Sequence, residues 1–576
     1  MELIVFAAVM FGIFLYVMFR GAYEEKRRKA RYRESLREAY GSFSDREYRP
    51  EDWERIARYY LLYGEQQENG NVIDDITWND LNMDGIFALM DFTQSSSGEE
   101  YLYALLHRSR LSDEDGAQAS MERHIGYMAA QEQERLDTMM LLHALGRTAG
   151  KYSLCDYLRY LETLGSRSNG KHYAAIAALA GATGLIFVKA PLGVALLIAV
   201  ACFNMITYMK EKSAASPYVT TFAYIMRMIN CADGIVRRGY GAEMEDYLGD
   251  LRRRRDCFSA FEKHSGMVMK MNAATGNVDD LLFDYVKMLT HIDIIKFNRM
   301  LQLVRENRRE IEALVAAIGY LDTVISIAYF RAALPWWCAP MLTEGRGVPL
   351  VVEEGYHPAL GRPVPNSFSQ TRGMLVTGSN ASGKSTFLKM TAINAILAQT
   401  IHTCAAQAYS GNYYRIYSSM ALRDSLEDGE SYYIVEIKAL KRIMDAAAEQ
   451  SDNPLLCFVD EVLRGTNTVE RIAASAQIME KLSQQGIYCF AATHDIELTH
   501  LLEASYDNYH FEEEVKEGDV LFSYRLLAGR AHTRNAIKLL EIIGFSQDII
   551  RRADDMAGEF LRTGEWSRAG DLREKP

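Results

Sequence analysis

The segment that most constrains the fold of this chain is GSNASGKST, which runs from Gly378 to Thr386. It matches the phosphate-loop pattern of a glycine, four residues and then Gly-Lys-Ser/Thr. A short apolar strand pattern, MLVTG, leads into it, and an apolar-periodic helix pattern begins at Phe387. Strand, glycine-rich loop and helix are the context in which backbone N–H groups hold phosphate oxygens. The segment therefore predicts a nucleotide-binding α/β domain in the C-terminal half.

Two residues of this loop have predicted roles in ATP chemistry. Lys384 is expected to reach the β- and γ-phosphates, and Ser385 to hold magnesium. A chance match in a glycine-containing turn is the alternative, and the flanking strand and helix patterns argue against it. The other candidate nucleotide-binding positions are Gly378, Ser379, Asn380, Ala381, Ser382, Gly383 and Thr386.

A second segment, LLCFVDE at residues 455–461, has the composition of a buried parallel strand. Asp460 and Glu461 stand at its C-terminal end, where ligands of open α/β sheets bind. We expect Asp460 to contact magnesium through its water shell and Glu461 to orient and deprotonate the attacking water. A solvated strand end is the structural alternative for this acidic pair.

Three segments together, GSNASGKST, VDEVLRGTNT and ATHDIELTH, resemble the MutS family of mismatch-repair ATPases, which belongs to the ABC class. The family's loop has a proline where this chain has Ser379. The similarity is strong over about residues 336–559 and weaker over about residues 77–329. It implies an ABC-type P-loop ATPase domain that uses ATP and magnesium and forms a homodimer through its paired ATPase domains.

The resemblance also assigns roles to residues that their local sequence would leave open. His494, otherwise a strand-end histidine, matches the switch histidine that senses the γ-phosphate and is a catalytic candidate. Ser431 lies in a stretch similar to the signature loop, so it is expected to contact the γ-phosphate held by the partner subunit. His357, Pro358, Pro365 and Asn366 match the segment that flanks the adenine. These roles are implied by the family and not by spacing.

The N-terminus predicts a membrane anchor. Residues 3–19 are an uncharged apolar run of 17 residues, which as a helix spans about 25 Å. No Lys or Arg precedes the run and eight follow it by residue 37, so the positive-inside rule places the rest of the chain in the cytoplasm. A cleaved signal peptide is the alternative, but its charge would precede the apolar core.

Two further apolar runs, residues 173–188 and 192–208, predict a transmembrane hairpin over 173–208. A buried helical hairpin is the alternative, although a core helix normally keeps a polar face. The expected location is thus the cell membrane, multi-pass, with the ATPase domain cytoplasmic. The net charge of −12 argues against a protein held to nucleic acid by bulk charge.

The predicted fold is a C-terminal α/β ABC-type ATPase domain preceded by an all-α, lever-like core with a transmembrane hairpin and an N-terminal transmembrane helix. The family's mismatch sensors carry an N-terminal domain with a Phe-x-Glu wedge, and no such motif precedes residue 77. We therefore expect a membrane-anchored variant without the mismatch-recognition domain. The predicted segments are 1–20 (transmembrane helix), 21–76 (basic juxtamembrane segment and linker), 77–335 (helical core), 336–560 (ATPase) and 561–576 (disordered tail).

Two functional hypotheses follow. In the first, ATP binding and hydrolysis at paired sites drive lever movement in DNA binding, in a role like mismatch repair or related to recombination. In the second, the same ATPase is a membrane mechanoenzyme or envelope factor without a DNA role. An ABC transporter is disfavoured because the three short spans carry almost no charged residue that could line a pathway.

Overall fold

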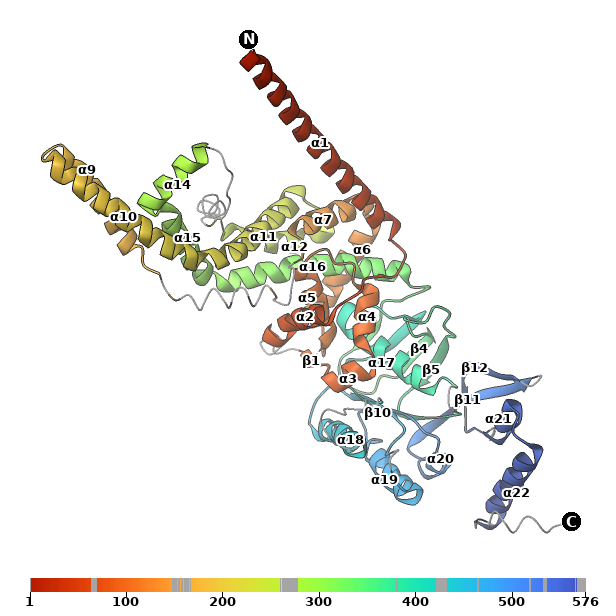
Figure 1. Cartoon of the computed structure of the whole chain (residues 1–576). Coiled ribbons are helices and arrows are strands. Elements are labelled where there is room, and N and C mark those ends of the chain that lie inside the picture. The colour runs from red at the N-terminus through yellow and green to blue at the C-terminus, as the bar shows by residue number, and fades with distance from the viewer. Residues whose placement is uncertain are drawn as a thin grey trace. The chain divides into compact units, whose positions relative to one another are not determined.

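The computed structural model describes residues 2–63, 70–147, 153, 156, 159, 165, 167–258, 261, 278–379, 382–420, 432–463, 466–516, 519–531, 536–564 and 566. The chain forms two compact units (Figure 1). The helical unit contains Met1–Glu68, Ala88–Leu105 and Ala117–Ala333, and the sheet unit contains Asn69–Phe87, Leu106–Gly116 and Leu334–Pro576.

The helical unit is built around one long helix, α16 (Arg308–Ala333). Its apolar residues recur three and four apart, and Ile311, Leu314, Ile318, Leu321, Ile325 and Ala328 are all buried. This apolar seam packs against α6, α11 and α12 of the same chain. The elements of this part of the chain are α1 (Glu2–Glu38), α2 (Pro50–Tyr63), α5 (Ser96–His107), α6 (Ala117–Ala130), α7 (Glu132–Leu145), α9 (Gly170–Ile186), α10 (Ala190–Ala215), α11 (Val219–Arg238), α12 (Glu245–Asp256), α14 (Val278–Thr290) and α15 (Ile292–Glu306).

Among the described side chains of the N-terminal helix α1, those of its last turns contact this unit. Every described side chain from Leu15 to Arg31 is exposed, whereas Leu36 is buried. Tyr32 donates a hydrogen bond to Gln94, and Arg33 forms an ion pair with Asp137 at 2.7 Å. The predicted 17-residue apolar run belongs to a continuous 37-residue helix, and its described side chains are exposed.

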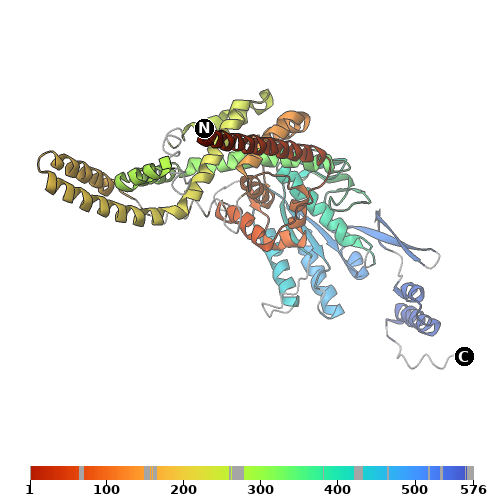
Figure 2. The same ribbon diagram turned by 45° about the horizontal axis from the view of Figure 1, so that its top comes forward.

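Helices α9 and α10 form an antiparallel pair that lies side by side in both views (Figures 1 and 2). Among the described residues, two helices are long and apolar enough to cross a membrane. The first is α10, with a mean hydropathy of 2.1 and 17% of its apolar window buried. The second is α16, of which 78% is buried, as in the core helix of a soluble protein.

The base of the α9–α10 hairpin is fixed to α14 and α15 by buried polar contacts. The Nδ1 atoms of His172 and His291 lie 2.9 Å apart. Asn204 donates a hydrogen bond from Nδ2 to the Leu289 carbonyl at 2.9 Å, and the Tyr208 hydroxyl donates to Asp293 at 2.6 Å. Beyond this base, most side chains of the two helices are exposed.

The sheet unit holds a six-stranded sheet in the order β12-β11-β6-β10-β9-β8 and a four-stranded sheet in the order β3-β7-β4-β5. Strands β8, β9, β10, β6 and β11 are parallel, and β12 is antiparallel to β11. The predicted strands at 374–378 and 455–461 are thus confirmed as β6 and β9 of one parallel sheet, in which β10 lies between them. The strands are β3 (Met341–Thr343), β4 (Leu350–Gly355), β5 (Asn366–Gln370), β6 (Gly373–Thr377), β7 (Ala408–Asn412), β8 (Arg415–Ser419), β9 (Leu455–Asp460), β10 (Ile487–Ala492), β11 (Tyr506–Lys516) and β12 (Asp519–Ala528).

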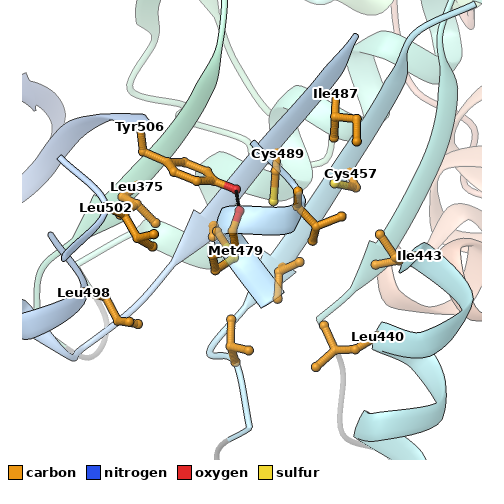
Figure 3. Close-up of a cluster of buried hydrophobic side chains, with 14 of the residues drawn as sticks. Leu375, Leu440, Ile443, Cys457, Met479, Ile487, Cys489, Leu498, Leu502 and Tyr506 are labelled. Carbon is orange, nitrogen blue, oxygen red and sulfur yellow. Dashed lines mark hydrogen bonds between the residues drawn. The ribbon is translucent and has the colours of Figure 1, made fainter. Parts of the chain in front are cut away.

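Apolar residues of β9 and β10 form one of the buried clusters of this unit (Figure 3). Burial on both faces explains their continuous apolar sequences. Tyr506 closes one side of the cluster and donates a hydrogen bond from its hydroxyl to the Met479 carbonyl at 2.8 Å. The helices of the unit are α17 (Lys384–Ile401), α18 (Tyr432–Ala448), α19 (Thr468–Lys481), α20 (Ile496–Leu501), α21 (Ala536–Ile543) and α22 (Gln547–Thr563).

Two stretches from the N-terminal half belong to the sheet unit. The carboxylate of Asp80, in α3 (Asp75–Asp80), accepts hydrogen bonds from Ser418 Oγ at 2.7 Å and from the Met420 N–H at 2.8 Å. Gln399 donates to the Arg110 carbonyl at 3.0 Å, next to β2 (Arg108–Arg110), which pairs with β1 (Gly70–Val72). The sequence placed these residues in a linker and a helical core, because such long-range contacts leave no local pattern.

Candidate nucleotide-binding site

The phosphate loop begins where β6 ends and closes at the first residue of α17. Gly378 has a φ of 146°, and a Cβ atom there would lie 2.9 Å from the Phe511 carbonyl oxygen. Gly383 has a φ of 107°, and a Cβ atom there would lie 3.1 Å from the Tyr524 ring. Both positions require glycine, because an L side chain would be strained and crowded. The helix then starts at Lys384, so its first N–H groups face the loop.

Lys384 folds back over the loop that precedes it. Its Nζ atom donates hydrogen bonds to the carbonyls of Gly378 at 2.9 Å and Ser379 at 2.7 Å. Burial lowers the pKa of its ammonium group, and the neighbouring carboxylates of Asp460, Glu461 and Glu513 oppose that shift. An ammonium has three N–H donors, so one remains for a phosphate oxygen.

Acidic residues predicted at the end of β9 meet this loop. Burial raises the pKa of Asp460, and a hydrogen bond from Ser385 acts in the opposite direction. The two residues predicted to bind magnesium therefore touch each other. The next residue, Glu461, places Oε1 2.8 Å from Nε2 of His494, which follows β10. Parallel strands β9 and β10 bring both ends to one edge of the sheet, as predicted.

A cavity of about 470 Å³ opens beside the loop. Lys384, Glu461 and His494 line it together with Ser382, Gly383, Ser385 and Thr386. His357 also lines it, and burial lowers the pKa of this ring to about 4, so the imidazole is neutral at physiological pH. Pro365 is half-buried beside the cavity, between two of the residues that form its wall, Val364 and Asn366.

Among the wall residues that the sequence analysis did not single out, Phe511 and Tyr524 reach the cavity from β11 and β12. Asn366, which the resemblance placed in the adenine-flanking segment, joins them from β5. Asn366 accepts a hydrogen bond from the Leu526 N–H at 2.7 Å and donates to the Tyr524 carbonyl at 3.1 Å. Tyr524 has a φ of 52°, which is uncommon for a tyrosine. Because the β11–β12 hairpin carries no motif, only tertiary structure places it here.

The residues present fit a nucleoside triphosphate with magnesium. Ser382 is buried, lines the cavity, and its hydroxyl has no hydrogen-bond partner among the described residues. A buried polar group without a partner is costly, and a phosphate oxygen would satisfy it. Ser385 and Asp460 supply the hard oxygen ligands that magnesium prefers, and the metal would neutralise phosphate charge when bound. Thr386 is exposed next to Ser385.

Three predicted site residues lie outside the described residues. They are Asn380 and Ala381 in the phosphate loop and Ser431 in the segment that resembles the signature loop. Of the remaining candidates, residues 382–386, Glu461, His494 and His357 line one cavity, and Asp460 contacts this wall through its hydrogen bond with Ser385.

Comparison with known proteins agrees with this geometry. A family model described as MutS domain V matches residues 374–561. The chain is 29% identical over 326 residues to a protein of Oleidesulfovibrio alaskensis named DNA mismatch repair protein MutS, covering 54% of this chain and 34% of the relative. It is 31% identical over 261 residues to a protein of the same name from Thermus thermophilus, covering 44% of this chain and 31% of that relative. The chain thus spans about a third of the length of these curated relatives.

The matched region includes the phosphate loop, the β9 acidic pair and the histidine after β10, and of these residues 382–386, Glu461 and His494 line one cavity. This chain therefore carries a MutS domain V, an ATPase domain of the P-loop ABC type, in a sequence distantly homologous to MutS proteins over about half its length.

Proposed function

We propose that this chain is a membrane-anchored MutS-type ATPase, in which ATP binding pairs two copies and moves the membrane-attached helical unit. The observation that carries the membrane part is the apolar surface of the α9–α10 hairpin. Its most exposed large side chains are Phe187 (88%), Val188 (78%) and Ile206 (71%). Soluble proteins rarely expose contiguous apolar surface of this kind without a partner.

The distribution of charge supports a bilayer as that partner. In the hairpin between residues 173 and 208 the single charged side chain is Lys189 at the turn. At the base, Glu211 pairs with Lys171 and with Arg167, the latter at 3.5 Å. Basic residues at the base and an apolar body fit a hairpin whose two ends lie on the cytoplasmic side. Basic residues also follow the apolar part of α1, which supports placing the C-terminal end of this helix on the same, cytoplasmic side as the base of the hairpin.

Membrane attachment is tested by expressing the full chain and washing the membranes with alkaline carbonate. We expect the chain to stay in the pellet and to be extracted by detergent. The matched control is a chain in which two exposed hairpin residues, Ile198 and Ile206, are both changed to lysine. Release of the wild-type chain by carbonate alone would refute integral insertion.

The match to MutS domain V supports the proposed pairing of two ATPase sites, since MutS ATPases typically dimerise. A ligand that binds the paired state better than the single state shifts the population toward pairing. The test uses the Glu461→Gln chain, in which bound ATP should persist. Light scattering on detergent-solubilised protein should show twice the protein mass with saturating ATP and magnesium. A mass that remains monomeric would contradict the pairing.

The relatives are named for DNA mismatch repair, and a mismatch-repair-related role for this chain is therefore plausible. We propose DNA as the first candidate on which the ATP-driven movement acts. The ATPase rate of the detergent-solubilised chain should then rise with duplex, mismatched or branched DNA, and the rise should be lost in Lys384→Ala. If the chain contacts DNA phosphates, its affinity for DNA should also fall steeply as the salt concentration rises.

A membrane mechanoenzyme without a DNA role is the second candidate, and one observation favours it. The basic run Arg252–Arg255 in α12 is a candidate surface for nucleic acid, and three of its four arginines pair with acidic neighbours. Asp250 pairs with Arg253 at 3.2 Å and with Arg254 at 2.6 Å, and Arg255 pairs with Asp233. An ATPase rate that depends on Lys384 but ignores every DNA form would support this candidate and refute the first.

A further inference from the structure

A third carboxylate acts on the phosphate loop, besides the two at the end of β9. Glu513 accepts a hydrogen bond from the Ser379 hydroxyl. Its charge also favours the protonated form of Lys384, and it therefore counteracts the effect of burial on the pKa of that residue. The described residues that line the cavity do not include Glu513. It therefore acts on the loop without being part of the nucleotide-facing wall.

The position of Glu513 follows from the lengths of two neighbouring strands. β11 runs parallel to β6, from Tyr506 opposite Gly373 to His510 opposite Thr377. β6 ends there and the phosphate loop begins, while β11 continues to Lys516. The pairing of β11 with β12 shifts between Phe511 and Glu513, as at a β-bulge, which bends a strand locally. The extension of β11 is thereby brought against the loop.

Two consecutive loop residues are held between this extension and Lys384. On one side, the Phe511 backbone packs against Gly378, and Glu513 binds Ser379. On the other side, Lys384 binds the carbonyl oxygens of the same two residues at 2.9 and 2.7 Å. The ammonium keeps its third donor for phosphate only while both carbonyls stay in place.

We propose that Glu513 is a positioning residue for nucleotide binding, which acts through Ser379 to fix the first half of the phosphate loop. Serine has two free backbone dihedrals, so without an external contact this part of the loop would have to be ordered when the nucleotide arrives. A loop that is already ordered avoids that entropic cost of binding. The proposal rests on the ATPase domain alone and is independent of the membrane and of DNA.

The experiment measures the dissociation constant of a fluorescent ATP analogue with magnesium, on the detergent-solubilised full chain. We expect Ser379→Ala and Glu513→Ala each to weaken binding about tenfold, as for the loss of a hydrogen bond to a charged group. The double variant should bind no more weakly than either single variant, because both changes remove the same contact. Additive losses, or unchanged affinity in both single variants, would overturn the proposal.

Two conservative variants separate positioning from charge and from general strand stability. Glu513→Gln keeps an oxygen that accepts the Ser379 hydrogen bond, so its affinity should stay within about threefold of the wild-type value. If Glu513→Ala fails to fold, the affinities of Glu513→Gln and Ser379→Ala still test the proposal. Glu512→Gln is the matched control, since Glu512 is on the same strand and pairs with His510 at 3.0 Å instead of with the loop. If Glu513→Gln lost as much ATP affinity as Ser379→Ala, the charge and not the hydrogen bond would be responsible. If Glu512→Gln lost as much ATP affinity as Glu513→Ala, the effect would be one of strand stability. Either result would refute positioning by this hydrogen bond.

Discussion

Replacement of Glu461 by glutamine should abolish hydrolysis while leaving ATP binding intact. Glu461 has a φ of 60°, and its backbone N–H donates to the Ala492 carbonyl at 2.9 Å. This backbone bond orients the side chain toward His494, whose Nε2 lies 2.8 Å from Oε1. Glutamine keeps the size, the backbone bond and one side-chain oxygen, but it is not a base. The variant therefore removes proton transfer without opening a cavity.

The size of the effect follows from the role of a general base. Proton transfer by a positioned side chain contributes about 10²–10⁴ in rate. This range corresponds to about 3–5 kcal/mol in the barrier. ATP affinity should be unchanged or higher, because one of the negative charges that face Lys384 is lost.

The assay is single-turnover hydrolysis of ATP, measured beside equilibrium binding on the same preparation. Glu497→Gln is the matched control, since Glu497 is exposed in the first turn of α20 and does not line the cavity. It should hydrolyse ATP at the wild-type rate. A Glu461→Gln chain that keeps more than about a tenth of the single-turnover rate would refute Glu461 as the base. Loss of ATP binding in that variant would show instead that the carboxylate maintains the site.

Four further predictions concern the site and the hairpin. Lys384→Met should weaken ATP binding by about 2–3 kcal/mol, as for a lost hydrogen bond to a charged group, and equilibrium binding would show it. Gly383→Ala should cost about 1–2 kcal/mol of stability in urea unfolding, because an L side chain is strained at a φ of 107° and meets Tyr524. The pKa of His357 falls to about 4 on folding, so the unfolded chain binds more protons than the folded chain between pH 4 and 6.5. This contribution to the free energy of unfolding is therefore fully present above pH 6.5 and is lost as the pH falls. At pH 5 the wild-type chain should lose about 1–2 kcal/mol more free energy of unfolding than His357→Gln, measured in urea and after allowance for partial exposure. Ile198→Lys should reduce the membrane-bound fraction if the hairpin spans the bilayer, at about 3 kcal/mol per charge, and should be nearly neutral on a soluble surface.

Local sequence determined the central part of the fold and most of the candidate site. The phosphate loop and the apolar strand before Asp460 are continuous patterns, because a buried parallel strand must be apolar on both faces and a phosphate loop needs glycine at fixed positions. Parallel strand topology then requires their C-terminal ends to meet. The apolar seam of α16 is likewise a local pattern, since helical periodicity is a property of the sequence itself.

Contacts between residues far apart in the chain were decided by the tertiary structure alone. Tyr524 and Phe511 reach the nucleotide cavity from a hairpin without a motif, and Glu513 reaches Ser379 across 134 positions. The stretches around Asp80 and Arg110 join the sheet unit through hydrogen bonds that no periodicity encodes. Sequence patterns record which face of an element is buried, whereas the partner that buries it is set by the packing of the whole chain.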